Sequence, residues 1–91
     1  MRECMEDLPN LRLRLKKIEG QIRGISDMLE KDIPCNDVLI QINAAKSALH
    51  KVGQLVLEGH LHHCVKHGIE SGDAESTLED LSKVIEYFSR I

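Results

Sequence analysis

The chain has 91 residues, with 12 Lys+Arg against 15 Asp+Glu and a formal net charge of −3. This length predicts a single small domain, residues 1–91, which buries only about 60–65% of its unfolded surface and is marginally stable as a lone monomer. The chain is 42% hydrophobic but only 2% aromatic, a composition that favours helices over sheets. It argues against a disulfide scaffold and against an enzyme with a large buried cleft. The acidic total, taken alone, also argues against nucleic-acid binding.

A first helix is predicted to begin after Leu8-Pro9-Asn10, because proline is tolerated in the first helical turn. We expect residues 1–9 to form a flexible N-terminal tail. The helix ends before Pro34, since the residue before a proline avoids the α conformation. Gly20 and Gly24 inside it predict the close approach of another helix. Its apolar residues recur in steps of three and four and predict one buried stripe: Leu11, Leu15, Ile18, Ile22, Ile25 and Leu29.

A second helix is predicted from about Cys35 to His67, a stretch without proline. Further apolar residues lie beside its main stripe, so this helix must be covered on more than one side. At 1.5 Å per residue it spans about 50 Å, more than the first helix can cover. Self-association is the simplest explanation. The stripe forms a heptad seam: Cys35, Val38, Ile42, Ala45, Leu49, Val52, Val56 and Gly59.

Gly68 and residues 70–73 predict a turn, and a third helix follows from Ala74 to Phe88. The sequence therefore predicts an all-α chain of three helices with a long middle helix. No stretch approaches 18 apolar residues, and the N-terminus lacks an apolar signal segment, so we expect a cytoplasmic protein with no membrane partner. The stripe of the third helix is Leu78, Leu81, Val84, Ile85 and Phe88.

Charge is unevenly distributed along the chain. Residues 10–54 carry eight Lys/Arg against five acids, whereas residues 55–91 carry three against seven. The basic half is either a solvated face or a surface for DNA phosphates. The shortage of aromatic residues argues against base stacking on single strands, so the expected nucleic acid is a duplex. The candidate residues are Arg12, Arg14, Lys16, Lys17, Arg23, Lys46 and Lys51.

His60 and Cys64 lie four residues apart and therefore share one helix face. Imidazole and thiolate are donors suited to copper(I), zinc or nickel. Cys35 is the obvious third donor, but 25 residues of straight helix place it about 37 Å away. Antiparallel packing of two copies about an axis near Leu49 would bring Cys35 of one chain opposite residues 60–64 of the other. We therefore predict two identical metal sites in one symmetric dimer.

Other interpretations of these residues remain open. Cys35 is also suited to be a small core residue, and His60 and Cys64 to mark an ordinary helix end. His67 shares their face and is a weaker metal candidate that would favour nickel or cobalt, and Cys4 is a weaker candidate in the tail. A thiol enzyme has little support, because no oriented base accompanies the cysteines. We predict that the chain is not an enzyme.

Three segments together resemble the copper-sensing operon repressor (CsoR/RcnR) family of bacterial metal-responsive regulators. These are residues 14–24, RLKKIEGQIRG, residues 37–49, DVLIQINAAKSAL, and residues 60–65, HLHHCV. The resemblance covers roughly residues 10–91. It implies an all-helical antiparallel homodimer, a tetramer made of two dimers, and a DNA-binding repressor without a helix-turn-helix.

The resemblance also implies an effector and a set of roles. In copper-sensing members a Cys, a His 25 residues later and a Cys four further bind copper(I), the spacing of Cys35, His60 and Cys64. It implies binding of operator DNA in the metal-free form and release on copper(I) binding, with Arg14 and Lys51 at positions that relatives use for DNA. The alternatives are a sensor of nickel/cobalt, persulfide or formaldehyde, and a small copper-binding helical protein without a DNA role.

One pair of positions departs from the family pattern. Copper-sensing relatives often have a tyrosine before the first cysteine, paired with a glutamate in the third helix. Here Pro34 precedes Cys35, and the third helix offers Asp80 or Glu79 as the acid that supports the histidine. The link from the metal site to the third helix is therefore expected to differ from the usual one.

Overall fold

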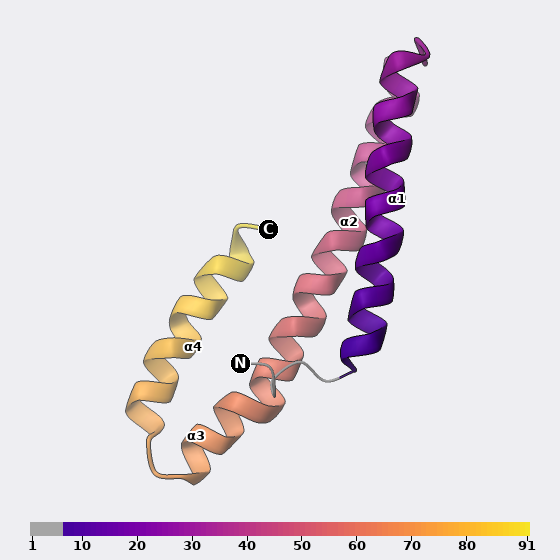
Figure 1. Ribbon diagram of the computed structural model, residues 1–91. Helices are drawn as coiled ribbons and strands as arrows, with labels where there is room; N and C mark the ends of the chain where they lie inside the picture. The colour runs from indigo at the N-terminus through magenta and orange to yellow at the C-terminus, as the bar shows by residue number, and fades with distance from the viewer. Residues whose placement is uncertain (1–6) are drawn as a thin grey trace. The chain divides into compact units, whose positions relative to one another are not determined.

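The computed structural model describes residues 7–91, and this part of the chain is helical apart from its connecting turns (Figure 1). The second, third and fourth elements follow one another without a break, so they form one long helix whose winding changes midway. The predicted all-α class with a long middle helix is confirmed. Cys4 lies outside the described residues. The elements are α1 (Leu8–Glu30), α2 (Cys35–Gly59), the π-helix η2 (His60–Val65), α3 (Lys66–Glu70) and α4 (Ala74–Ser89).

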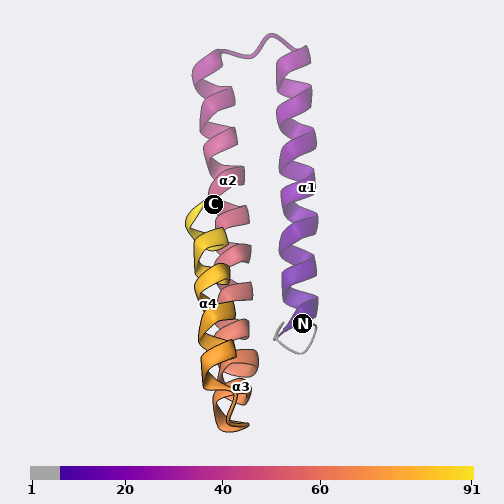
Figure 2. The same ribbon diagram turned by 90° about the vertical axis from the view of Figure 1, so that its left-hand side faces the viewer.

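Residues 9–52 form one compact unit, a hairpin of α1 and most of α2. The two helices run in opposite directions from their connecting loop (Figure 2). The buried side chains recur every seven residues on each helix, as expected where two helices pack along a shared stripe. They are Leu11 and Ile18 of α1 and Val38, Ala45 and Val52 of α2.

The loop between α1 and α2 begins with a Schellman turn. The Ile33 N–H donates to the Met28 carbonyl at 3.3 Å across Asp32, whose φ is 57°. This pair of features satisfies a terminal carbonyl and turns the chain out of the helix. The helix therefore ends at Glu30 through the left-handed conformation of Asp32, before the predicted terminator Pro34 is reached.

Residues 53–91 belong to a second compact unit, in which α4 runs back along the preceding helix. A Cβ at Gly68 would overlap with the Thr77 side chain, and one at Gly53 would lie 3.0 Å from Ile91 Cδ1. Both glycines thus allow α4 to approach closely. The predicted turn at Gly68 is wrong, because the helix continues to Glu70 and the turn is made at Gly72, with φ 87°.

Three of the six predicted stripe residues of α1, three of the eight of the long middle helix and two of the five of α4 are exposed. The stripe predicted to be buried on α1 is therefore buried only in part within a single chain, because so few helices cannot cover one another on every side. For α2 the prediction was that a second copy must cover it, and a single chain leaves part of it exposed. Gly20 and Gly24 are also open: outside the adjoining backbone of their own helix, no atom of residues 7–91 lies within 4 Å of an added Cβ. No helix among residues 7–91 combines the length and apolar character needed to cross a membrane. The exposed residues are again seven apart: Leu15, Ile22 and Leu29; Cys35, Ile42 and Leu49; Leu78 and Ile85.

Candidate metal centre and basic surface

A π-helical segment, His60–Val65, carries both donors predicted near the end of the long helix. Gly59 and His60 are both buried, although consecutive residues of an α-helix point about 100° apart. The wider winding absorbs this shift and lets the buried face continue from His60 to Val65. Such segments are rare and occur frequently at functional sites. The sequence signal is the phase shift at Gly59–His60, which a plain helix prediction overlooks.

His60 is buried, and its Nε2 lies 3.5 Å from the Asp80 Oδ2 of α4. Asp80 is largely exposed, so the carboxylate approaches His60 from the solvent side. Cys64 is half-buried beside them. The structure thus brings together His60, Cys64 and Asp80, whereas Glu79 is exposed and does not line their pocket. This pocket, of about 280 Å³, is lined by His60, Cys64, Val65, Ser76, Thr77 and Asp80.

The first turn of α4 is fixed by its contacts with the end of α3. The Asp73 N–H donates to the Gly68 carbonyl at 3.0 Å. The Thr77 hydroxyl donates to the Asp73 carbonyl at 2.6 Å, and the Thr77 side chain lies over Gly68. Asp80 follows Thr77 by three residues and therefore shares its helix face. Gly68 and Thr77 thus position the Asp80 carboxylate, although neither was predicted as a site residue.

Residues 7–91 of one chain supply an incomplete set of metal donors. The orientation of His60 Nε2 toward a carboxylate leaves Nδ1 as the nitrogen that can bind a metal. Among residues 7–91, however, no three His, Cys, Asp or Glu side chains form a group that could hold a metal ion. His67 is exposed and belongs to no such group. Cys35 is exposed at the start of α2, so its interpretation as a core residue of a single chain is wrong.

The predicted basic residues all fall within residues 9–52. Arg14 is half-buried, and its Nε is buried without a hydrogen-bond partner in the part of the chain that the structure describes. A buried N–H without an acceptor is costly, so this group favours a ligand that brings an oxygen. It lies in a pocket of about 420 Å³, the Arg14 pocket, lined by Asn10, Leu13, Arg14, Lys17, Ile18, Gln21 and Ala48.

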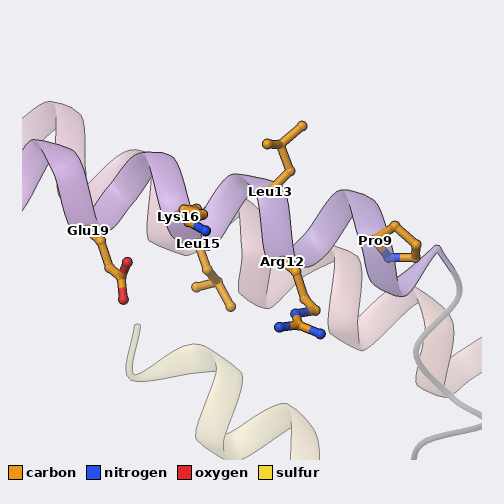
Figure 3. Close-up of a pocket in the computed structure, with 6 residues that line it drawn as sticks. All are labelled: Pro9, Arg12, Leu13, Leu15, Lys16 and Glu19. Atoms are coloured by element: carbon orange, nitrogen blue, oxygen red, sulfur yellow. The ribbon is translucent and has the colours of Figure 1, made fainter.

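A second pocket on α1, the Arg12 pocket, has a volume of about 520 Å³. Figure 3 shows Arg12, Leu15 and Glu19 pointing to one side of the helix and Leu13 to the other. Among residues 7–91, Glu19 is the one acid that lines it. Exposed cationic side chains therefore surround the first half of α1. The lining residues are Pro9, Arg12, Leu13, Leu15, Lys16 and Glu19.

Comparison with known proteins identifies relatives of the chain. Residues 7–88 match the model of a family described as metal-sensitive transcriptional repressors. The chain is 47% identical over 77 residues to the copper-sensing transcriptional repressor CsoR of Bacillus subtilis, covering 85% of this chain and 76% of that protein. It is 44% identical over 78 residues to the copper-sensing transcriptional repressor RicR of Mycobacterium tuberculosis, covering 84% and 81% of the two chains.

Two solved structures share the fold. The copper-sensing repressor CsoR with Cu(I) from Geobacillus thermodenitrificans superposes with a TM-score of 0.85 and 44% identity, over 92% of this chain and 88% of that chain. The nickel-responsive transcriptional regulator InrS also gives a TM-score of 0.85, with 37% identity, over 92% and 94% of the two chains. The resemblance inferred from the three sequence segments is confirmed.

Proposed function

The chain belongs to the family of metal-sensitive transcriptional repressors, and from this premise we propose that it is a copper(I)-responsive repressor of the cytoplasm. It binds operator DNA in the metal-free form and releases it on binding copper(I). The observation that carries this proposal is the pairing of His60 and Cys64 in one pocket, with Asp80 against the histidine. Regulation of DNA binding, rather than catalysis, is the activity that this family description supports.

The donor set is completed by a second copy of the chain. Cys35 of one chain joins His60 and Cys64 of the other, which accounts for the incomplete set within residues 7–91 of one chain. The structure has Cys64 in a disulfide, so the proposed site requires its reduced form. Two thiolates and one imidazole then form the low-coordinate site that copper(I) accepts, whereas zinc normally takes a fourth ligand. His60 binds through Nδ1, while Asp80 accepts a hydrogen bond from Nε2–H and holds the ring in place.

The exposed stripes support this assembly. Cys35, Ile42 and Leu49 lie at heptad spacing on one face of α2, as expected for a helix that pairs with a copy of itself. An antiparallel homodimer would cover this face and bring Cys35 to the second chain's donors. The stripe of Leu15 and Ile22 on α1 offers a further apolar surface, and we propose that it serves the pairing of dimers into a tetramer.

The basic surface supports the DNA-binding half of the proposal. A phosphate oxygen would satisfy the buried Nε of Arg14, and Lys17 of the same pocket would add a second cation. Contacts of this kind position a protein on duplex DNA and make its affinity depend on salt. The remaining proposed phosphate contacts are Arg12, Lys16, Arg23, Lys46 and Lys51.

A nickel-responsive regulator is the second candidate, because InrS superposes with the same TM-score as CsoR. Nickel prefers more nitrogen donors and higher coordination than the proposed set supplies. The exposed His67 would have to join the site, and residues 7–91 of one chain do not bring it there. Copper(I) is therefore the better match.

A binding assay with the DNA upstream of the gene that encodes the chain tests the proposal. The metal-free protein is expected to shift this DNA, with an affinity that falls steeply as salt rises. Addition of buffered copper(I) should release the DNA, whereas nickel and polysulfide should leave the complex intact. Failure of the metal-free protein to bind, or indifference of the complex to copper(I), would contradict the proposal.

A further inference from the structure

Leu13 is an exposed leucine within a run of cations near the start of α1. It is 55% exposed and lines both the Arg12 pocket and the Arg14 pocket. In Figure 3 its side chain stands on the opposite side of the helix from Leu15. Lys16 and Lys17 follow it at three- and four-residue spacing and so share its face. Leu13 is thus an exposed apolar side chain flanked by cationic side chains.

The charge around Leu13 restricts what can cover it. Residues 9–17 contain four Lys/Arg and no acid. A symmetric contact with the same patch of a second copy would set these cations against one another, which is unfavourable. An occupant must therefore combine negative charge with apolar groups. Duplex DNA does so, because thymine places a methyl group on the floor of the major groove between two lines of phosphates.

We propose that Leu13 contacts thymine methyl groups in the major groove of the operator, an inference that rests on the proposed DNA-binding function. Leu13 lies inside a continuous helix, Leu8–Glu30. For its side chain to contact a base, the groove must therefore accommodate the helix itself. The major groove admits an α-helix, whereas the minor groove is too narrow. Lys16 and Lys17 bind phosphates beside the groove, and Leu13 adds a preference for sequences that present thymine.

The test compares Leu13→Ala with the unaltered protein on two forms of the same upstream DNA. One form is amplified with dTTP and the other with dUTP and uracil-containing primers, which removes every thymine methyl while base pairing is retained. Leu78→Ala is the matched control, because Leu78 is 54% exposed on α4, outside the basic run. Affinities are measured by fluorescence anisotropy at several salt concentrations, and the assembly state by sedimentation.

On thymine DNA, Leu13→Ala is expected to bind about tenfold more weakly than the unaltered protein, which corresponds to about 1.4 kcal/mol. On uracil DNA the two proteins should bind alike. Their salt dependence should be equal, because no phosphate contact is removed. Leu78→Ala should match the unaltered protein on both DNAs.

Equal weakening by Leu13→Ala on both DNAs, or a changed sedimentation coefficient, would overturn the inference, since Leu13 would then belong to an interface between copies or to the scaffold. A neutral Leu13→Ala on thymine DNA would overturn it while leaving the repressor function standing. Absence of salt-dependent binding by the unaltered protein would overturn both.

Discussion

The two compact units of the chain differ in charge and in chemistry. Residues 9–52 carry eight basic against five acidic residues and hold every proposed DNA contact. Residues 53–91 carry three against seven and hold His60, Cys64 and Asp80. Cys35 is the exception, because it is the proposed metal donor that belongs to the basic unit. A response of DNA binding to metal must therefore link the basic unit to the acidic unit. Cys35 can provide this link, because it is the metal donor that belongs to the basic unit.

The largest effect is expected from removing this exceptional donor. Cys35→Ala should abolish the release of DNA by copper(I), because the three-donor set loses its contribution from the basic unit. Its metal-free affinity for DNA should be unchanged, since Cys35 lies outside the two basic pockets. DNA binding measured with and without buffered copper(I) checks both statements. Full release by Cys35→Ala would show that the basic unit takes no part in metal binding.

Asp80→Asn tests the support of the histidine within the acidic unit. The carboxylate that faces His60 Nε2 at 3.5 Å would be replaced by a weaker acceptor. Copper(I) affinity should fall about 10- to 100-fold, the usual effect of losing such a partner. Competition with a copper(I) chelator gives the affinity, and Glu79→Gln is the matched control expected to bind normally. Equal effects of the two substitutions would mean that general negative charge, not this contact, matters.

Arg14→Ala tests the basic unit separately. Loss of a phosphate contact should lower DNA affinity about tenfold and reduce the logarithmic salt slope by about 1. Copper(I) affinity should stay the same. Arg90→Ala is the control, because Arg90 is exposed in the other unit and pairs with Glu86 at 2.7 Å. An unchanged salt slope for Arg14→Ala would remove Arg14 from the DNA contacts.

Much of the fold could be predicted because helical periodicity is a local signal. The steps of three and four located α1 and α2, and Pro34 marked the loop that Asp32 turns. The pattern does not say what covers a stripe, so Leu15 and Ile22 are exposed in a single chain despite their regular spacing. The sequence predicts a turn at Gly68, whereas the contact with Thr77, which a local pattern does not show, explains a glycine inside the helix.

For the candidate site, too, the local sequence pattern predicted helix faces but not the contacts that depend on tertiary packing. The spacing of His60 and Cys64 predicts a shared helix face, since they lie about one turn apart, and the structure places both in one pocket. The π-helical winding was not predicted, because it depends on fitting two consecutive buried residues, Gly59 and His60. The place of Cys35 in a complete site stays a prediction, since it depends on a second chain.

Gly68→Ala tests how the acidic unit is held together. The added methyl would overlap with Thr77, so the free energy of unfolding should fall by about 1–3 kcal/mol. Gly24→Ala in the basic unit meets open space and should raise it by about 0.5–1 kcal/mol. Urea denaturation at fixed protein concentration gives both values. A neutral Gly68→Ala would mean that α4 is free to move away, and Asp80 with it.

The smallest effect is expected at the loop of the basic unit. Asp32 adopts a φ of 57°, which glycine takes at no steric cost. Asp32→Gly should therefore raise the free energy of unfolding by about 0.5–1 kcal/mol. Glu30→Gly, at the last residue of α1, should lower it instead. The same denaturation experiment decides, and a destabilised Asp32→Gly would show that the aspartate side chain itself holds the loop.

The proposed copper(I) response depends most on completion of the metal site between two chains. A mixed dimer of one Cys35→Ala chain and one His60→Ala chain tests it directly, because sites shared between chains place both defects in one site and leave the other intact. Copper(I) titration of the purified mixed dimer should therefore find one tight site, while each altered homodimer has none. A mixed dimer without any tight site would contradict the account.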